Sequence, residues 1–451
     1  MSSLPVVAGA ALVLSLASCS HSRERPADNL RSRHAPRLIL ISVDGMRPDF
    51  YTKAEYRRAA PTLARMSDEG ESASRGIAPV FPSITYPNHV SMVTGAYSAE
   101  HGVYSNQIYS KTLGLLDDWY FYSNEIRVQT LWDAAEKAGL KTALIRWPAG
   151  VGAKVHWDFP EIFYPGSIDV PRDWTLIQRH TDPPSLLGEI EGAGPTKKPM
   201  LFADLDQMAL QTFEYLVDHE DPDLILIHLS NLDFVQHQFG TDAPEVTRAA
   251  AGIDAILAQI RKRVDPSKTT LIVTGDHGFA TYRNIIFIAP LIRAAGSENR
   301  VTALADGGQS AIYPLPGGQG ATIEDCRKIL RASRKYGHVL TLISKHRLQA
   351  LRAFPRAVCA FEAELGYVIS GKASAKAIQP TEGPRGHHGY LPSRPEMRAG
   401  FFIWGRAIGE AKSHHLRGDA QGKLVMPDIA PTAASILGIP FSAPDGTAIR
   451  F

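Results

Sequence analysis

Aspartate and histidine side chains follow the ends of several apolar segments of this sequence. They are Asp44, Asp233, His237, Asp276, His277 and the doublet His387-His388. Carboxylates and imidazoles together are suitable zinc ligands, and two such sets could hold two zinc ions. Each residue alone is weak evidence, since an aspartate after a strand is often a turn residue. The set as a whole predicts a two-metal centre, provided that the fold gathers these positions in one cleft.

A hydroxyl side chain, Thr85, lies two residues before Pro87. Because proline is favoured in the first turn of a helix, we expect Thr85 at a helix N-terminus, where backbone N–H groups and the helix dipole favour negative charge. A metal ion on the Thr85 oxygen would lower the pKa of the hydroxyl and make it a nucleophile. Two metal ions about 4 Å apart could stabilise the attacking and leaving oxygens of an in-line displacement at phosphorus.

The elements that must position these residues alternate along the chain. Short apolar runs, typical of strands buried on both faces, are residues 37–43, 141–145, 223–229, 269–274 and 399–404. The predicted helices are residues 62–69, 125–138, 202–219, 246–264 and a last one that opens at 426–432. This alternation predicts an α/β fold with a mainly parallel central sheet and helices on both faces. In such a sheet, ligands bind at the carboxyl ends of the strands.

Two stretches interrupt the alternation. Residues 165–200 are rich in Pro and Gly and are predicted to be irregular. Residues from about 283 to 385 mix short elements and turns, and we expect an insertion that packs beside the sheet. This insertion holds Cys326 and Cys359. The sequence leaves open whether they form a disulfide or remain two buried thiols.

The N-terminus resembles an export signal. Residues 6–16 are apolar but too short to span a bilayer, and they end in Leu16-Ala17-Ser18-Cys19, which resembles a bacterial lipobox. We expect a signal peptide over 1–19, a flexible tether over 20–36, and Cys19 as a candidate lipid anchor to the membrane. The expected location is the bacterial periplasm or outer membrane. An unmodified, cleaved signal peptide is the alternative.

The composition and net charge of the chain argue against a nucleic-acid partner. Of the 451 residues, 44% are apolar and 21% charged, which is ordinary for a globular protein. The formal net charge is +2, so we expect no nucleic-acid partner.

The motifs and their order resemble those of the nucleotide pyrophosphatase/phosphodiesterase family of the alkaline phosphatase superfamily. The matching stretches are residues 43–47, 81–95, 101–106, 147–148, 233–237, 274–279 and 388–390. The resemblance runs from about residue 37 to the C-terminus. It implies an alkaline phosphatase-like catalytic domain over 37–451, with the insertion as a cap subdomain.

The resemblance implies a role for each candidate residue. Thr85 matches the nucleophile that forms a phospho-enzyme, and Asn106 matches the asparagine that donates a hydrogen bond to the phosphoryl oxygen. The implied ligands of one zinc are Asp44, Thr85, Asp276 and His277. The implied ligands of the other zinc are Asp233, His237 and His388. His388, rather than His387, directly precedes Gly389-Tyr390 as the family's ligand does.

Two tyrosines are candidates for substrate binding. Tyr86 follows the nucleophile, where phenylalanine is frequent in the family, and an aromatic ring there could stack on a nucleobase. Tyr164 could form another wall of the pocket, the alternative being a tyrosine on a surface loop. The expected substrate is a small phosphodiester or nucleotide, and the expected reaction is hydrolysis of a phosphodiester or phosphoanhydride bond.

Two other functions remain open. A threonine-dependent phosphomonoesterase of the same superfamily would need extra cationic groups for a phosphate dianion. The stretch after Lys141 offers Arg146 but no Lys-x-Arg pair, which favours a diester. A catalytically inactive member that only binds ligands is the alternative of another class. The sequence contains the nucleophile and every implied zinc ligand, which argues against it.

Overall fold

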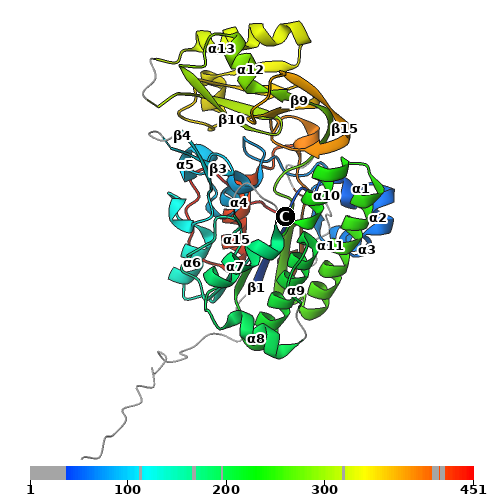
Figure 1. Cartoon of the computed structure of the whole chain (residues 1–451). Coiled ribbons are helices and arrows are strands. Elements are labelled where there is room, and N and C mark those ends of the chain that lie inside the picture. The colour runs from blue at the N-terminus through cyan, green and yellow to red at the C-terminus, as the bar shows by residue number, and fades with distance from the viewer. Residues whose placement is uncertain are drawn as a thin grey trace, which may run out of the picture. The chain divides into compact units, whose positions relative to one another are not determined.

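A central sheet of seven strands, in the order β2-β16-β8-β1-β7-β5-β6, carries the fold (Figure 1). The computed structural model describes residues 37–110, 114–164, 169–194, 197–316, 320–408, 416 and 422–451. Neighbouring strands from β8 to β6 run parallel, whereas β16 is antiparallel to β8 and β2 is antiparallel to β16. The predicted α/β fold with a mainly parallel sheet is confirmed. The predicted signal peptide, tether and lipidated Cys19 lie outside the described residues.

The bounds of the sheet and its helices are as follows. The strands are β1 (Arg37–Val43), β2 (Glu71–Ser72), β5 (Thr142–Ile145), β6 (Trp157–Phe159), β7 (Leu224–Leu229), β8 (Thr269–Thr274) and β16 (Phe401–Gly405). The helices are α1 (Asp49–Thr52), α2 (Ala54–Ala59), α3 (Pro61–Glu69), α4 (Thr85–Thr94), α5 (Ser98–His101), α6 (Leu131–Lys137), α7 (Val170–His180), α8 (Leu186–Ala193), α9 (Phe202–His219), α10 (Asn231–Phe239), α11 (Pro244–Arg263) and α15 (Ile429–Leu437). A short hairpin, β3 (Gln107–Ser110) and β4 (Gly114–Trp119), precedes α6.

Strand β1 shows why helices cover both faces of the sheet. Its side chains alternate between the two faces, as in any strand. Ile39 and Ile41 belong to an apolar cluster with residues of α9 and α11. Leu38 and Leu40 belong to a second cluster with residues of α6 and α15. A strand that is buried on both faces has apolar residues at nearly every position, and residues 37–43 show this pattern.

Two expectations for helices are wrong. The helix expected over 125–138 begins at Leu131, because Thr130 and Asp133 form a capping box that starts the helix there. Residues 165–200, expected to be irregular, contain α7 and α8. Asp169 caps α7, and Val170 and Ile177 bury its apolar face. The proline in the first turn of α7 is compatible with a helix start, so the Pro content of this stretch was misleading.

The insertion forms its own β-structure. Its elements are β9 (Ala280–Phe287), α12 (Ile288–Ala294), β10 (Val301–Asp306), β11 (Gln309–Pro314), α13 (Ile323–Ser333), β12 (Leu340–Ser344), α14 (Lys345–Ala350), β13 (Cys359–Ala363), β14 (Gly366–Ser370) and β15 (Ile378–His387). An antiparallel sheet has the order β10-β11-β13-β12, and a second sheet has the order β14-β9-β15. An apolar cluster fills the space between these elements and α12 and α13. At the C-terminal end of strand β15, the chain returns to the central domain.

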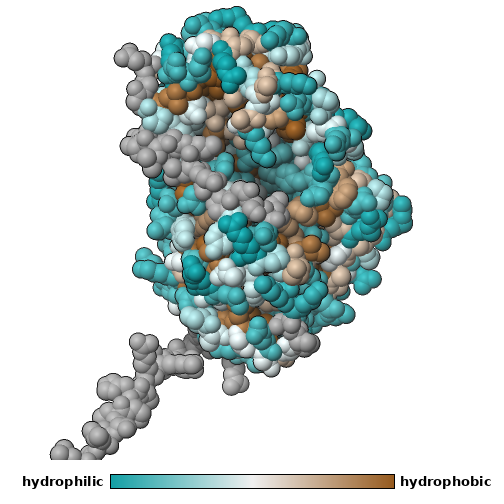
Figure 2. Space-filling model, viewed as in Figure 1, coloured by the Kyte–Doolittle hydropathy of each residue, from teal (hydrophilic) through white to brown (hydrophobic). Residues whose placement is uncertain are grey.

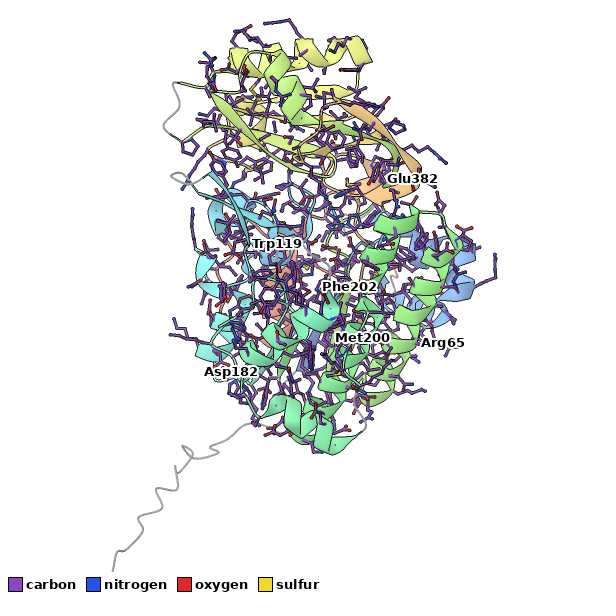
Figure 3. All side chains as sticks on the ribbon, viewed as in Figure 1. Arg65, Trp119, Asp182, Met200, Phe202 and Glu382 are labelled. Carbon is purple, nitrogen blue, oxygen red and sulfur yellow. A yellow bond between two sulfur atoms is a disulfide. The ribbon has the colours of Figure 1, made fainter. Side chains whose placement is uncertain are left out.

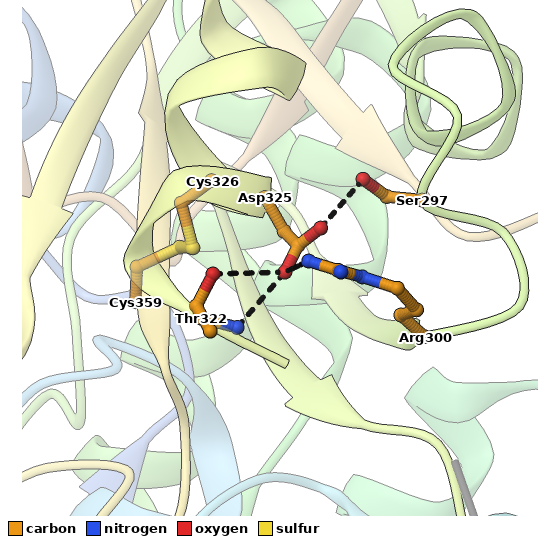
Figure 4. The surroundings of a disulfide bond; sticks show 6 residues. All are labelled: Ser297, Arg300, Thr322, Asp325, Cys326 and Cys359. Carbon is orange, nitrogen blue, oxygen red and sulfur yellow. Dashed lines mark hydrogen bonds and ion pairs between the residues drawn. A yellow bond between two sulfur atoms is a disulfide. The ribbon is translucent and has the colours of Figure 1, made fainter. Parts of the chain in front are cut away.

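Cys326 and Cys359 form a disulfide, which resolves the alternative that the sequence left open. The bond joins α13 to β13 in the insertion (Figure 4). The neighbouring carboxylate of Asp325 is buried, accepts hydrogen bonds from Ser297 Oγ and the Thr322 backbone, and pairs with Arg300. Among the helices that the structure describes, none is both long enough and apolar enough to span a bilayer.

Candidate two-metal active site

The first ligand set consists of Asp44, Asp276 and His277. Strands β1 and β8 are neighbours, so Asp44 and Asp276 follow adjacent strand ends. The Nε2 atom of His277 lies 3.4 Å from Asp44 Oδ1 and 3.1 Å from Asp276 Oδ2. The other Asp276 oxygen, Oδ1, accepts hydrogen bonds from the backbone N–H groups of Gly45 at 3.0 Å and of His277 at 2.9 Å. The carboxylate is therefore held with Oδ2 toward the other two ligands.

The donor atoms of this first set fit a cation. Asp44 Oδ1, Asp276 Oδ2 and His277 Nε2 are buried and have no hydrogen-bond partner among the described residues. The opposite atom of each side chain is anchored, and the His277 ring faces the carbonyl oxygen of Gly278 at 3.2 Å through Nδ1. A hydrogen bond at the second ring nitrogen is the usual arrangement of a metal-binding histidine. Buried polar atoms that face one another without hydrogen-bond partners are expected where a metal ion binds.

The second ligand set consists of Asp233, His237 and His388. Helix α10 places Asp233 and His237 one turn apart, with Oδ2 and Nε2 separated by 3.4 Å. His388 Nε2 lies 3.2 Å from His237 Nε2 and 3.7 Å from Asp233 Oδ1. His237 Nδ1 faces the carbonyl oxygen of Gly386 at 3.0 Å. The two sets adjoin, because Asp233, His277 and His388 also offer atoms within 4.8 Å of one another.

Both histidines of the doublet lie near the second set, since His237, His387 and His388 offer ring nitrogens within 4.8 Å of one another. The resemblance implies that His388 is the ligand. His387 points to Asp306 of the insertion, with 4.0 Å between Nε2 and Oδ1, and its ring centroid is 4.5 Å from that of His237. The sequence did not single out Asp306. Its place near the site depends on the β10–β11 turn of the insertion, which no local motif signals.

Thr85 begins α4, as predicted, and lines the same cavity as Asp44, Asp233 and His237. Asn106 Oδ1 accepts a hydrogen bond from the backbone N–H of Tyr86 at 3.0 Å. The carbonyl end of the Asn106 amide is thus fixed at the helix start, and only its Nδ2 group remains as a donor. That group lies 3.4 Å from Asp306 Oδ2. This orientation agrees with a role as a hydrogen-bond donor to an anion.

Burial dominates the electrostatics of both sets. It raises the pKa of Asp276 to about 7 and raises that of Asp44 well above its usual value, with Asp233 and Asp276 adding to the effect at Asp44. Burial lowers the pKa of His277 and of His388 well below the ordinary range, which favours the neutral form of both rings. Neutral imidazole is the form that ligates a metal. Clustered buried carboxylates call for a cation to balance them.

Four side chains joined by hydrogen bonds and ion pairs, which the sequence did not predict, extend from the first set. This polar row consists of Asp44, His228, Glu161 and Arg146. His228 lies in β7 beside β1, and its ring nitrogens lie 3.1 Å from Asp44 Oδ2 and 2.7 Å from Glu161 Oε2. Burial alone would lower the pKa of His228, but Glu161 and Asp44 raise it well above its ordinary value. The sequence signal for this row was His228, a histidine inside the otherwise apolar run 223–229.

The cavity at Thr85 has a volume of about 400 Å³ and aromatic walls that include Trp119, Phe202 and Phe234. Tyr86 also lines it, but its ring is buried edge-on against Trp119, with 5.5 Å between centroids, and its hydroxyl lies 3.4 Å from Glu161 Oε1. Tyr164 is not among the lining residues, so the prediction that it forms a wall is wrong. Its ring packs under the Arg172 guanidinium at 4.2 Å instead.

Sequence comparison identifies relatives of this chain. A model of the type I phosphodiesterase / nucleotide pyrophosphatase family matches residues 38–391. An uncharacterized pyrophosphatase/phosphodiesterase of Schizosaccharomyces pombe is 27% identical over 257 residues, which are 54% of this chain and 44% of that protein. Human ectonucleotide pyrophosphatase/phosphodiesterase family member 1 is 24% identical over 253 residues, 54% of this chain and 23% of that protein. The chain thus spans less than half the length of these relatives.

Solved structures share the fold. Human ectonucleotide pyrophosphatase/phosphodiesterase 5 aligns with a TM-score of 0.63 at 20% identity, over 91% of this chain and 97% of that one. The murine protein, solved in complex with AMP, aligns with a TM-score of 0.60 at 19% identity, over 90% and 97%. The family match extends from β1 to the residues just after His388, and so includes both ligand sets. This chain therefore belongs to the type I phosphodiesterase / nucleotide pyrophosphatase family.

Proposed function

We propose that this chain is a two-zinc phosphodiesterase and nucleotide pyrophosphatase that acts through a phospho-threonine at Thr85. The observation that carries the proposal is one cavity that holds Thr85 at a helix N-terminus together with residues of both ligand sets. The residues assigned to the first zinc are Asp44, Thr85, Asp276 and His277. Those assigned to the second are Asp233, His237 and His388. Nitrogen and oxygen donors in sets of three and four suit zinc.

The reaction would have two steps. Thr85 Oγ1 attacks phosphorus, and the alcohol or phosphate leaves from the opposite side; water then hydrolyses the phospho-threonine and restores the hydroxyl. When bound, the zinc ions would lower the pKa of the attacking hydroxyl and stabilise charge on the phosphoryl oxygens. Asn106 Nδ2 donates a hydrogen bond to a phosphoryl oxygen, and the first backbone N–H groups of α4 favour the same negative charge.

The surroundings of Arg146 favour a diester over a monoester as the substrate. A monoester dianion needs additional positive charge, and Arg146 is the cation that the sequence offered. Its guanidinium is buried and lies 3.2 Å from Glu161 Oε2, which balances the charge. A diester carries one negative charge less at the same phosphorus, and the largely apolar cavity suits its second substituent. We therefore place the phosphomonoesterase second.

Relative rates on three aryl substrates test the proposal. An aryl phosphodiester and an aryl nucleotide ester should be cleaved with a higher kcat/KM than the matching aryl monoester. A preference for the monoester would assign the chain as a phosphatase. Purified protein that lacks zinc after growth with zinc, and that cleaves none of the three, would favour the ligand-binding alternative.

We also propose that the chain is exported and anchored through Cys19. The support is the apolar segment 6–16 and the lipobox-like ending at Cys19. Bacterial cells that make the protein should incorporate labelled palmitate into it. The Cys19→Ser variant should not be labelled, and equal labelling of both proteins would contradict the anchor.

A further inference from the structure

The insertion brings a carboxylate, Asp306 at the end of β10, to the amide of Asn106. The Oδ2 atom of Asp306 accepts a hydrogen bond from Asn106 Nδ2 at 3.4 Å. The other carboxylate oxygen, Oδ1, lies 4.0 Å from His387 Nε2. Asp306 therefore adjoins the group that the proposed mechanism uses as the donor to a phosphoryl oxygen.

The turn that follows Asp306 packs closely against the chain segment of the second ligand set. Gly308 N–H donates a hydrogen bond to the carbonyl oxygen of His388 at 2.8 Å. Gly307 has a φ of +64°, and a Cβ atom there would lie 2.2 Å from the same oxygen. A Cβ atom at Gly308 would lie 2.3 Å from the ring of Tyr390. Because glycine alone permits this approach, the turn holds Asp306 at a fixed place beside the site.

The charge of Asp306 has no cationic side chain to balance it. Two buried carboxylates of the insertion, Asp325 and Glu362, are each paired with an arginine. Among the described residues, no Lys or Arg nitrogen lies within 4 Å of the Asp306 carboxylate, and its basic neighbour in that range is His387. Partial burial raises the pKa of Asp306 to about 6, so the carboxylate is charged at pH 8. Asp306 thus presents a negative charge to whatever Asn106 binds.

The distance from Asp306 to a bound phosphoryl oxygen is limited by two hydrogen bonds. The amide of Asn106 has two N–H groups, so it can donate to Asp306 and to the phosphoryl oxygen together. With a second bond of about 3 Å, the Asp306 oxygen lies at most about 6.4 Å from the phosphoryl oxygen. Repulsion between two unit charges at this separation changes an equilibrium by about threefold in water and by about 80-fold at an effective dielectric constant of 20.

A negative charge at this place discriminates between substrates that differ in charge. A phosphomonoester is largely a dianion at pH 8, whereas a phosphodiester is a monoanion. Both carry their charge on the phosphoryl oxygens, so the Asp306 carboxylate repels the monoester by one additional charge. Arg146, a cation that could offset this repulsion, is already paired with Glu161.

We propose that Asp306 is a specificity-determining residue that disfavours phosphomonoesters at this site. The proposal rests on the phosphodiesterase function proposed above and names the group of the insertion that selects substrates by charge. Asp306 acts across Asn106 through its negative charge, whereas Thr85 and the ligand sets carry the chemistry.

A matched pair of substrates tests the proposal. The pair is 4-nitrophenyl phosphate and its methyl diester, which have the same leaving group and differ by one charge at pH 8. Asp306→Asn keeps an oxygen that can accept from Asn106 but removes the charge, so its monoester-to-diester ratio of kcat/KM should exceed that of the wild type by about tenfold. If the diester is cleaved but the ratio is unchanged, the role of Asp306 is wrong and the phosphodiesterase stands. If the wild type cleaves no diester, both proposals fail.

A second carboxylate of the insertion provides the control. Glu382 is exposed on β15 (Figure 3), and Figure 2 shows hydrophilic side chains on this side of the insertion. Solvent and salt screen a charge in such surroundings, so Glu382→Gln should leave the monoester-to-diester ratio as it is. An equal rise in both variants would mean that the net charge of the insertion sets the ratio, and it would overturn the assignment to Asp306.

Equilibrium binding separates an effect of charge from an effect on the orientation of Asn106. Phenylphosphonate is largely a dianion at pH 8 and methylphenylphosphinate is a monoanion, and neither has an ester bond to cleave. In calorimetric titrations of protein with equal zinc content, Asp306→Asn should bind phenylphosphonate about tenfold more tightly than the wild type does, with a smaller gain for methylphenylphosphinate. Equal changes for both ligands, or loss of zinc from the variant, would show that Asp306 supports the structure of the site and would overturn the proposal.

Discussion

The two ligand sets are built from different kinds of structure. Asp44, Asp276 and His277 follow adjacent strands of the central sheet and are at most 4% exposed. Asp233 and His237 lie on helix α10, and their side chains are 18% and 31% exposed. His388, the third member of the second set, follows the last strand of the insertion. The first set is part of the sheet, whereas the second forms where α10 meets the chain that returns from the insertion.

The difference concerns how firmly the ligands are held. The first set is fixed by backbone N–H donors to Asp276 and by the polar row behind Asp44. In the second set, His237 is held by the Gly386 carbonyl of β15, so its orientation depends on the insertion. A preorganised, buried site loses less conformational entropy on binding a metal. We therefore expect the first site to bind zinc more tightly and to exchange it more slowly.

Loss of the proposed nucleophile should have the largest effect, because Thr85 is the group that attacks phosphorus in the proposed mechanism. Thr85→Ala should lower kcat on an aryl diester by about 10⁴-fold or more, while the fold and most of the bound zinc are kept. Kinetics and metal analysis on the same sample measure both quantities. The control is Thr94→Val at the other end of α4, whose hydroxyl bonds only within its own chain segment. Full activity of Thr85→Ala would show that the nucleophile is another group.

Removal of one ligand from each set should separate the two sites. Asp276→Ala and His237→Ala should each lower kcat/KM by at least about 100-fold, since each removes part of the charge stabilisation. Metal analysis should find that each variant retains about one zinc per chain. During dialysis against a weak chelator, the wild type should release the zinc of the second set first. Release in the opposite order would contradict the comparison.

The sequence was sufficient where the pattern is local. The apolar run of β1, the helix α9 and the strand β8 have the predicted bounds, because each depends on periodicity within its own segment. The ligand sets followed from strand ends and from family motifs. The polar row was missed because His228 and Glu161 are 67 residues apart and meet only in the folded sheet. Asp306 was missed for the same reason, since it is 200 residues from Asn106.

Loss of the polar row should weaken zinc binding at the first site alone. His228→Gln keeps a donor for Asp44 but cannot bridge Asp44 and Glu161 or carry the positive charge. Outer-shell changes of this kind typically cost about 10–100-fold in metal affinity, and we expect that loss for the first zinc only. Competition with a fluorescent zinc chelator measures both affinities. His101→Gln, a buried histidine bonded to Ser91 at 3.1 Å, is the matched control. Equal loss at both sites would mean that the row supports the fold rather than Asp44.

The smallest effect is expected for a change at Asp158, which lies outside the site and can be compared with Asp276. Like Asp276 it is a buried carboxylate, but neither of its oxygens has a well-formed hydrogen bond among the described residues. The backbone of Gly152 is a weak polar neighbour that lowers the pKa, and the nearby charged group is another carboxylate, Asp182. Burial raises the pKa of Asp158 well above its usual value, and Asp182 adds to this. A carboxyl group with a raised pKa in the folded state destabilises the protein progressively as pH rises above the unfolded value of about 4.

Asp158→Asn should therefore stabilise the fold by about 1–3 kcal/mol at pH 8 and by little near pH 4. Asp276→Asn should not stabilise the zinc-loaded protein, because the proposed charge balance between the Asp276 carboxylate and zinc is lost with a neutral amide. Urea unfolding at the two pH values measures the difference. If Asp158→Asn destabilises the protein at pH 8, the carboxylate has a partner that balances its charge, and an unpaired buried oxygen in this fold would no longer by itself indicate a metal ligand.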